Sequence, residues 1–172
     1  LYLPTVRESD GSLSASGAKI RLKWLPIKPA EGNAGWFGGV NVELARVDQR
    51  YSEVPLSSEM RFIGGYRAEK WLVSVNPIFG FDLSPGYRQG GPDFTLALKG
   101  AREVSPGLAL GLEYYSSMGK IAHTLPSNLQ ENTVYLVVDW DAEPWAINFG
   151  VGRGLNNATD TWTIKSIVSV PF

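Results

Sequence analysis

The feature that most constrains the fold is an alternation of apolar and polar residues that recurs along the chain. In the last segment, "WTIKSIVSVPF", polar residues including Thr163, Lys165 and Ser169 share one parity. The other parity carries Trp162, Ile164, Val168, Val170 and Phe172. Because successive side chains of a strand point to opposite faces, this pattern predicts a strand with one apolar and one polar face. The apolar face must look either into a core or into lipid.

The same alternation predicts an all-β fold of ten strands in one antiparallel up-and-down domain that covers residues 1–172. Clusters of Gly, Pro, Asn, Asp and Ser separate the strands. The expected strands are 1–7, 17–28, 34–47, 57–67, 70–83, 93–103, 106–117, 132–141, 144–153 and 160–172. No segment between them has a helical period, and no run of about 18 apolar residues predicts a transmembrane helix. The start, "LYLPTVRESDG", has no signal-peptide pattern, so we expect a mature chain or one that lacks N-terminal residues.

The connections between these strands alternate in length. Long polar connections such as "DQRYSEVPLS" and "SMGKIAHTLPSNLQE" alternate with tight ones such as "AEK", "VSP" and "AEP". In an up-and-down barrel the long connections then lie at one end and the short ones at the other. This arrangement is typical of transmembrane β-barrels of the bacterial outer membrane, which have long extracellular loops and short periplasmic turns.

Aromatic residues at the strand ends favour the lipid-facing interpretation. Two belts of amphipathic rings at interface height are what a bilayer selects. The predicted girdle consists of Trp24, Trp36, Tyr66, Trp71, Trp140, Trp145, Trp162 and Phe172. Apolar residues of the same parity, such as Val73, Leu112 and Leu136, lie between the belts and would face lipid.

The opposite parity carries charged residues that would face the lumen of the barrel. The predicted lumen charge network is Lys19, Arg21, Lys23, Glu43, Glu59, Arg61, Lys99, Glu113, Asp139 and Lys165. Pairing across the turn near Glu31 is expected to place Lys19 opposite Glu43 and Arg21 opposite Asn41. The next loop is expected to bring Glu43 near Glu59 and Arg61. Bases and acids nearly balance, so the network predicts a narrow interior of paired charges. In a soluble lipocalin-like barrel the same residues would form the solvated outer face.

The final strand resembles the C-terminal signature of bacterial outer-membrane β-barrel proteins, which end in Phe behind alternating apolar residues. Phe172, Val170, Val168 and Ile164 match this signature, and Ser166 departs from it. The resemblance implies that Val168, Val170 and Phe172 form the assembly signal read by the barrel-assembly machinery. It further implies a location in the outer membrane, in contact with the bilayer and lipopolysaccharide.

Two longer stretches carry a narrower resemblance. "INFGVGRGLNNATDTWTIKSIVSVPF" and "GYRAEKWLVSVNPIFGFDLS" are similar to an uncharacterised family of proteobacterial outer-membrane proteins, described as hypothetical proteins or transporters. This resemblance covers most of the chain and implies a barrel but no activity. It also implies extra sequence before Leu1 and up to twelve strands in the complete barrel.

Composition and spacing argue against several classes of function. The chain has no Cys, a single His and a net charge of −1, which leaves no thiolate chemistry and no basic field for nucleic acid. His123 lies in a predicted loop without a nucleophile motif, so we expect no enzyme, cofactor or metal. The glycines of "GVGRG" are expected to relieve crowding where Gly150 and Gly152 face the lumen. Asp139 and Asp141 form a weak candidate for a cation site, although solvation of the lumen mouth explains them as well.

The sequence therefore predicts a narrow outer-membrane channel or facilitator for small solutes. Two alternatives stay open. One is a structural or partner-binding barrel with a closed lumen, and the other is a soluble β-barrel that binds an apolar ligand.

Overall fold

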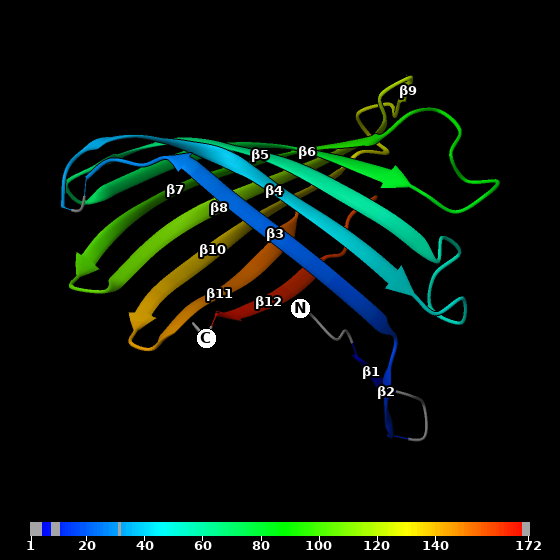
Figure 1. Ribbon diagram of the computed structural model, residues 1–172, viewed down its shortest axis with the longest axis horizontal. Helices are drawn as coiled ribbons and strands as arrows, with labels where there is room; N and C mark the ends of the chain where they lie inside the picture. Colours follow the sequence, from blue (N-terminus) through cyan, green and yellow to red (C-terminus); the bar gives the residue numbers. More distant parts are fainter. Residues whose placement is uncertain (1–4, 8–10, 31, 170–172) are drawn as a thin grey trace.

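The computed structural model describes residues 5–7, 11–30 and 32–169, and within these ranges the chain is built from β-strands without a helix. The long strands are β3 (Gly17–Ile27), β4 (Gly35–Val47), β5 (Leu56–Ala68), β6 (Trp71–Asp82), β7 (Asp93–Ser105), β8 (Leu108–Lys120), β10 (Glu131–Ala142), β11 (Trp145–Gly154) and β12 (Trp162–Ser169). Three short strands accompany them: β1 (Thr5–Arg7), β2 (Leu13–Ala15) and β9 (His123–Thr124). Figure 1 shows the long strands side by side in a strongly tilted, curved sheet.

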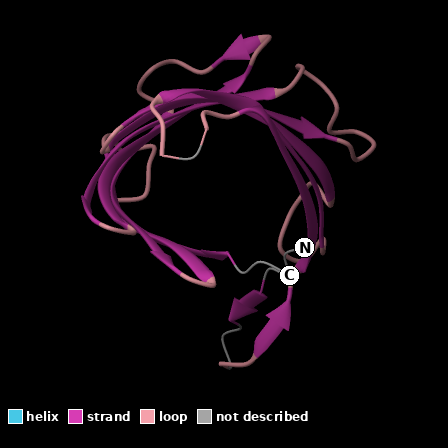
Figure 2. Ribbon diagram, turned by 60° about the vertical axis from the view of Figure 1, so that its left-hand side comes forward, coloured by secondary structure: helices cyan, strands magenta, loops and turns pink. Residues whose placement is uncertain are grey.

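The nine long strands pair in the order β12-β11-β10-β8-β7-β6-β5-β4-β3, and every ladder is antiparallel. The sheet curls into an open half-barrel, seen end-on in Figure 2. Among the described residues, the outer edges of β3 and β12 have no partner strand. Within the described ranges the predicted all-β antiparallel fold is therefore present, and the sheet consists of nine long strands and the two-residue β9 instead of the ten strands expected.

The described part of the first predicted strand, residues 5–7, does not join this sheet. This segment, β1, pairs with β2 in a separate hairpin in which Thr5 faces Ala15 and Arg7 faces Leu13. The sequence pattern predicts a loop, and not a strand, for the residues of β2. Because Gly and Ser surround this short segment, its alternation is too brief to show which strand it pairs with.

The register between β3 and β4 differs from the expected one by two residues. Arg21, not Lys19, faces Glu43, and Lys23 faces Asn41. The Ile27–Gly38 pair places the centre of the turn beyond residue 31, and an irregularity between Trp24 and Ile27 shifts the ladder further. A two-residue shift keeps each side chain on its face, because the side-chain period of a strand is two. The expected pairing of Glu43 with Glu59 is present.

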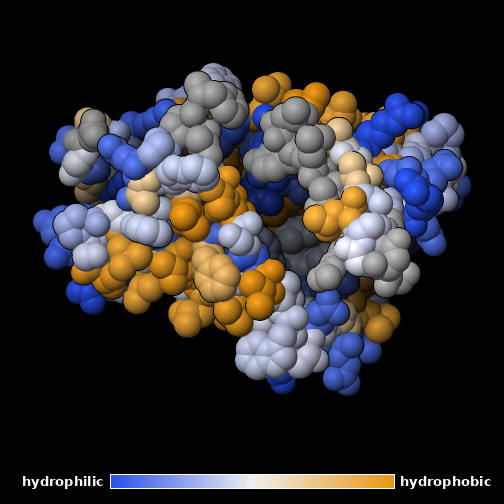
Figure 3. Space-filling view, turned by 90° about the horizontal axis from the view of Figure 1, so that it is seen from below, coloured by the Kyte–Doolittle hydropathy of each residue, from blue (hydrophilic) through white to orange (hydrophobic). Residues whose placement is uncertain are grey.

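The two faces of the sheet have opposite chemistry. Large apolar side chains are exposed on the convex face, including Trp36 at 72%, Ile164 at 71% and Leu136 at 64%. Polar side chains are buried on the concave face, among them Asn41, Glu43 and Glu113. Figure 3 shows apolar side chains gathered in broad patches on the surface, with a hollow near the middle of the molecule. Small or medium apolar side chains such as Val137 and Ile78 are buried as well, so the two faces differ mainly in where the large apolar and the charged side chains lie.

The connections separate by length, as expected. Residues 69–70, 106–107 and 143–144 form tight turns at one end, where residues 28–34 make a longer connection. Residues 48–55, 83–92, 121–130 and 155–161 form long connections at the other end. The connection 121–130 contains the short strand β9, which pairs with the end of β8. His123 therefore lies in a strand opposite Lys120 and not in an irregular loop.

Candidate functional site

The concave face, which we call the lumen face, holds two clusters of charges around buried carboxylates. The first centres on Glu43 of β4, whose side chain is only 8% exposed. The Arg21 guanidinium donates to Glu43 Oε2 through Nη2 at 2.6 Å and Nε at 2.9 Å. Lys19 Nζ approaches Glu43 Oε1 at 3.3 Å. One carboxylate therefore compensates two cations of the neighbouring strand.

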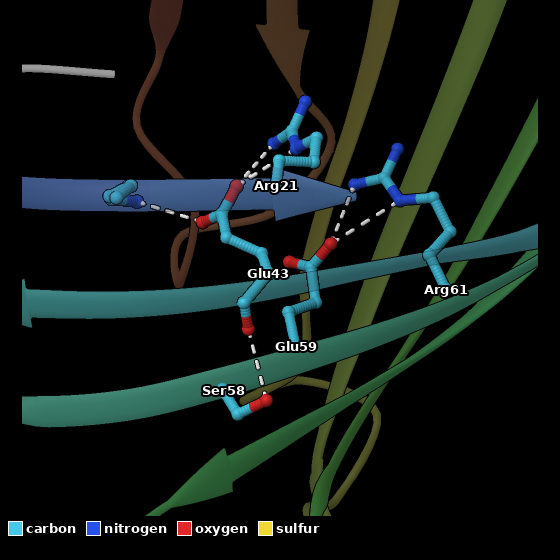
Figure 4. Close-up of polar contacts among 6 residues, drawn as sticks. Arg21, Glu43, Ser58, Glu59 and Arg61 are labelled. Carbon is cyan, nitrogen blue, oxygen red and sulfur yellow. Dashed lines mark hydrogen bonds and ion pairs between the residues drawn. The ribbon is translucent and has the colours of Figure 1, made fainter. Parts of the chain in front are cut away.

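Figure 4 shows this cluster across β3, β4 and β5. Arg61 and Glu59, two residues apart on β5, form their own ion pair with Nη2 of Arg61 3.2 Å from Oε1 of Glu59. The Ser58 hydroxyl donates to the Glu43 backbone carbonyl at 2.9 Å. The direct cross-strand neighbour of Glu43 is Glu59, so the two carboxylates are tolerated side by side only because each has its own Arg partner.

The second cluster centres on Glu113 of β8, which is 6% exposed at its side chain. Lys99 Nζ lies 3.1 Å from Glu113 Oε1, and Lys165 Nζ forms an ion pair with Oε2. The Tyr115 hydroxyl donates to Oε2 at 2.8 Å, and the Asn148 amide donates to Oε1 at 3.4 Å. These partners come from β7, β8, β11 and β12, so Glu113 ties four strands together from inside the half-barrel.

Asp139 and two tyrosines extend this second cluster. Asp139 lies 2.6 Å from Lys99 Nζ and accepts a hydrogen bond of 2.7 Å from Asn148 Nδ2. Tyr115 and Tyr135 meet edge to face with ring centroids 5.6 Å apart. Lys165 Nζ lies over both rings, 5.4 and 5.1 Å from their centroids. The cluster thus fills part of the lumen with side chains.

Gly150 and Gly152 make room for this cluster. Both lie on the lumen face of β11, where Gly150 pairs with Lys165 and Gly152 with Tyr135. A Cβ at Gly152 would lie 2.5 Å from Cε1 of Tyr135, and one at Gly150 would lie 2.9 Å from Cγ1 of Val137. Glycine is therefore required at these two positions because any larger side chain would be crowded, and the "GVGRG" stretch lies within strand β11.

Nine of the ten residues predicted for the lumen charge network form ion pairs with one another. Lys23 is the tenth, and no described residue forms an ion pair with it; it faces the neutral Asn41. The Glu43 partners are Lys19 and Arg21; Arg61 pairs with Glu59 of its own strand instead.

The predicted girdle residues of the described ranges lie on the convex face. Trp24, Trp36, Trp71, Trp140, Trp145 and Trp162 are exposed, at 49% to 72%. Tyr66 is half-buried because its ring packs edge to face on Trp36 at 5.2 Å. Val168, exposed on β12, belongs to the predicted assembly signal. Val170 and Phe172 lie outside the described residues.

Sequence reasoning missed Tyr115, Tyr135 and Asn148 as members of the second cluster. Tyr115 shares the parity of Glu113, and Asn148 the parity of Gly150 and Gly152, so the signal was present in the alternation. The alternation does not show which of these side chains meet, because residues such as Asn148 and Glu113 are 35 positions apart in the sequence.

The long-connection end has its own polar contacts. Lys120 Nζ lies 2.5 Å from Asp82 Oδ2 and 2.8 Å from Asp93 Oδ2, which links β6, β7 and β8 where they leave the sheet. In the connection 48–55, hydrogen bonds from the side chain and backbone of Arg50 lower the pKa of Asp48. These contacts order the ends of the strands.

A cavity of about 900 Å³ opens along the lumen face toward the short-turn end. Charged, amide and apolar side chains line it, with contributions from β3 to β8, β10 and β12. The described residues contain no group of three or more His, Asp and Glu that could hold a metal ion, so Asp139 and Asp141 do not gather further ligands.

Fold and site together define an antiparallel half-barrel with a charged inner face and an apolar outer face. No protein-family model, curated protein sequence or solved structure matches this chain. Within the described ranges, no helix is long and apolar enough to cross a membrane.

Proposed function

We propose that this chain forms the wall of a bacterial outer-membrane β-barrel that acts as a narrow channel for small solutes. The observation that carries the proposal is the inverted distribution of side chains. Leu112, Leu136 and Ile164 are 58% to 71% exposed on the convex face, whereas Glu43 and Glu113 are buried on the concave face. Contiguous exposed apolar surface of this extent marks contact with a membrane or a protein partner.

The dimensions and the aromatic residues fit a bilayer. A strand of 12 or 13 residues, such as β6 or β7, tilted by about 40°, spans the roughly 25 Å apolar band of an outer-membrane barrel. The exposed Trp residues sit near the strand ends, where interfacial rings anchor membrane proteins. In this proposal the short turns face the periplasm, the long connections face outward near lipopolysaccharide, and the barrel-assembly machinery inserts the chain.

The membrane assignment predicts that the folded protein is extracted from cells only with detergent. On an SDS gel, the unheated protein should migrate faster than the boiled protein, because a folded barrel resists SDS and stays compact. Cell fractionation and a paired gel measure both properties. Recovery of folded protein from the soluble fraction without detergent would refute the assignment.

The channel is expected to be narrow because side chains cross the lumen face. The Glu113 cluster joins four strands, and Lys165 packs over two tyrosine rings. Barrels of about eight strands are filled by their own side chains, and slightly larger ones leave only small aqueous gaps. We therefore expect a low conductance, well below that of a large open porin.

Glu43→Ala is predicted to raise the conductance or the gating noise and to shift selectivity toward anions. The carboxylate compensates both Lys19 and Arg21, so its removal leaves two cations at the lumen face. Planar-bilayer recordings with reversal potentials in a salt gradient measure both effects. Glu53→Ala, in the exposed connection 48–55, serves as the control and should behave as wild type. An unchanged reversal potential in Glu43→Ala would contradict the prediction.

The second candidate is a structural or partner-binding barrel with a closed lumen. The Glu113 cluster favours it, because a carboxylate with two lysine partners and two further hydrogen bonds forms a rigid plug. Complete electrical silence of wild type and Glu43→Ala, with folded protein in the membrane, would support this candidate. A soluble barrel for an apolar ligand is disfavoured by the charged lining of the cavity. The proposal includes no enzymatic role and no cofactor, and His123 is exposed in β9.

A further inference from the structure

The charges that line the lumen cavity are separated by sign. Four of the lining cations, Arg21, Lys23, Arg61 and Arg67, come from β3 and β5. Three lining carboxylates, Glu103, Asp139 and Asp141, come from β7 and β10. Lys99 of β7 is the exception, and two carboxylates already pair with it. Glu69 and Lys70 contribute one charge of each sign from the turn between β5 and β6.

Each side of the cavity keeps charges that no described residue pairs with. Arg21 and Arg61 have acidic partners, whereas Lys23 and Arg67 form no ion pair with any described residue. On the other side, Asp139 pairs with Lys99, whereas the described residues offer no ion-pair partner to Glu103 and Asp141. The remaining charge is thus positive on β3 and β5 and negative on β7 and β10.

The positive side also contains a buried amide oxygen without a partner. Asn41 is 5% exposed, its Oδ1 has no hydrogen-bond partner, and it lines the cavity. Lys23 faces it on β3 and Arg61 faces it on β5, so the three side chains form one row across the sheet. Asn76 Oδ1 is a second buried and unpartnered amide oxygen on the cavity lining. Both oxygens are acceptors, so they suit a hydrogen-bond donor of a bound solute and not its carboxylate.

We propose that the lumen cavity binds dipolar solutes that carry a carboxylate at one end and an ammonium group at the other, such as ω-amino acids or short peptides. This inference rests on the proposed channel and names its solute class. Lys23 and Arg67, the lining cations that no described residue pairs with, receive the carboxylate, and Asp141 with Glu103 receives the ammonium group.

The sign pattern selects this class over simpler ions. A small anion would be attracted by the cations of β3 and β5 and repelled by the carboxylates of β7 and β10. A small cation would be attracted by these carboxylates and repelled by the cations. A solute with both charges gains from both sides when it lies across the cavity. Arg67 offers the planar donor geometry that suits a carboxylate, whereas the Arg61 guanidinium already donates to Glu59 through Nε and Nη2.

The test uses two isomers of equal size that differ in charge. 6-Aminohexanoate is a zwitterion, and 6-hydroxyhexanamide is neutral with the same molecular formula. Liposome swelling measures entry of each solute through the reconstituted protein, and saturation-transfer NMR on the folded protein in detergent measures binding independently of transport. We expect the entry rate of the zwitterion to exceed that of the neutral isomer by about threefold, a factor that one exposed ion pair can supply. We also expect a binding signal for the zwitterion alone.

Matched variants assign the effect to the two sides. Lys23→Gln and Asp141→Asn remove one exposed charge from each side, and each should bring the ratio of entry rates close to one. Lys28→Gln and Asp160→Asn remove exposed charges outside the cavity and should keep the wild-type ratio. Heat-modifiability on a gel verifies that each variant is folded.

The outcomes separate this inference from the channel proposal. Equal entry and equal binding of the two isomers in wild type would overturn the inference while the channel stands. A similar decrease of the ratio in all four variants would overturn it as well, because the effect would then not depend on the cavity. Zwitterion-specific binding without entry of either solute would support the binding site and refute the channel.

Discussion

Replacing Glu113 by alanine is expected to lower the free energy of unfolding by about 3–5 kcal/mol, the usual cost of removing one partner of a buried ion pair. Glu113 is 5% exposed and accepts contacts from Lys99, Lys165, Tyr115 and Asn148. Its loss leaves the Lys165 ammonium, 18% exposed at its side chain, without a carboxylate. Urea unfolding of the refolded protein in lipid or detergent measures the change.

Glu131→Ala is the matched control for this prediction. Glu131 is the same residue type on the adjacent strand β10, where it is exposed. Surface substitutions of this kind usually change stability by less than about 0.5 kcal/mol. Equal losses in Glu113→Ala and Glu131→Ala would show that the cluster does not hold the strands together.

Gly65→Ala is expected to destabilise the fold by about 3 kcal/mol, the upper end of the usual cost of overpacking. Gly65 lies on the lumen face of β5 between Phe37 and Ser74. A Cβ there would overlap the backbone carbonyl oxygen of Val73 and the Phe37 ring. The carbonyl belongs to the paired strand β6 and cannot move without breaking the ladder, so the strain spreads into the sheet.

Gly100→Ala makes the same substitution in β7, where a Cβ would meet no atom within 4 Å. We expect a change near zero or a gain of roughly 0.5 kcal/mol from the lower entropy of the unfolded chain. Comparing the two variants in the same urea titration isolates the steric contribution. Similar midpoints for Gly65→Ala and Gly100→Ala would contradict the close approach of β5 and β6.

The assignment of residues to faces could be predicted from the sequence because it depends only on a period of two. Glu43 and Arg21 stay on the lumen face when the register shifts by two residues, as it does here. The partner of each charge could not be predicted, since a turn centred beyond residue 31 placed Arg21 instead of Lys19 opposite Glu43. The bond from Lys99 to Asp139 depends on sheet curvature, because the two side chains come from strands separated by β8.

The pairing of β1 with β2 could not be predicted from the sequence either. Residues 5–7 alternate like the other strands, yet they pair with residues 13–15 only. A three-residue strand gains little stability from pairing with any one partner, so its sequence alone does not determine which strand it pairs with. The cavity could not be foreseen either, because it depends on which of the inward charges remain unpaired after the neighbouring strands are placed.

The directions of β3 and β12 restrict how the half-barrel can close. Eight antiparallel ladders separate the two edge strands, so β3 and β12 run the same way. Joining their edges directly would create a parallel pair in an otherwise antiparallel sheet. A uniformly antiparallel ring needs an odd number of strands between them. Any single strand that fills this position must run from the short-turn end to the long-connection end and present apolar side chains outward at every second residue.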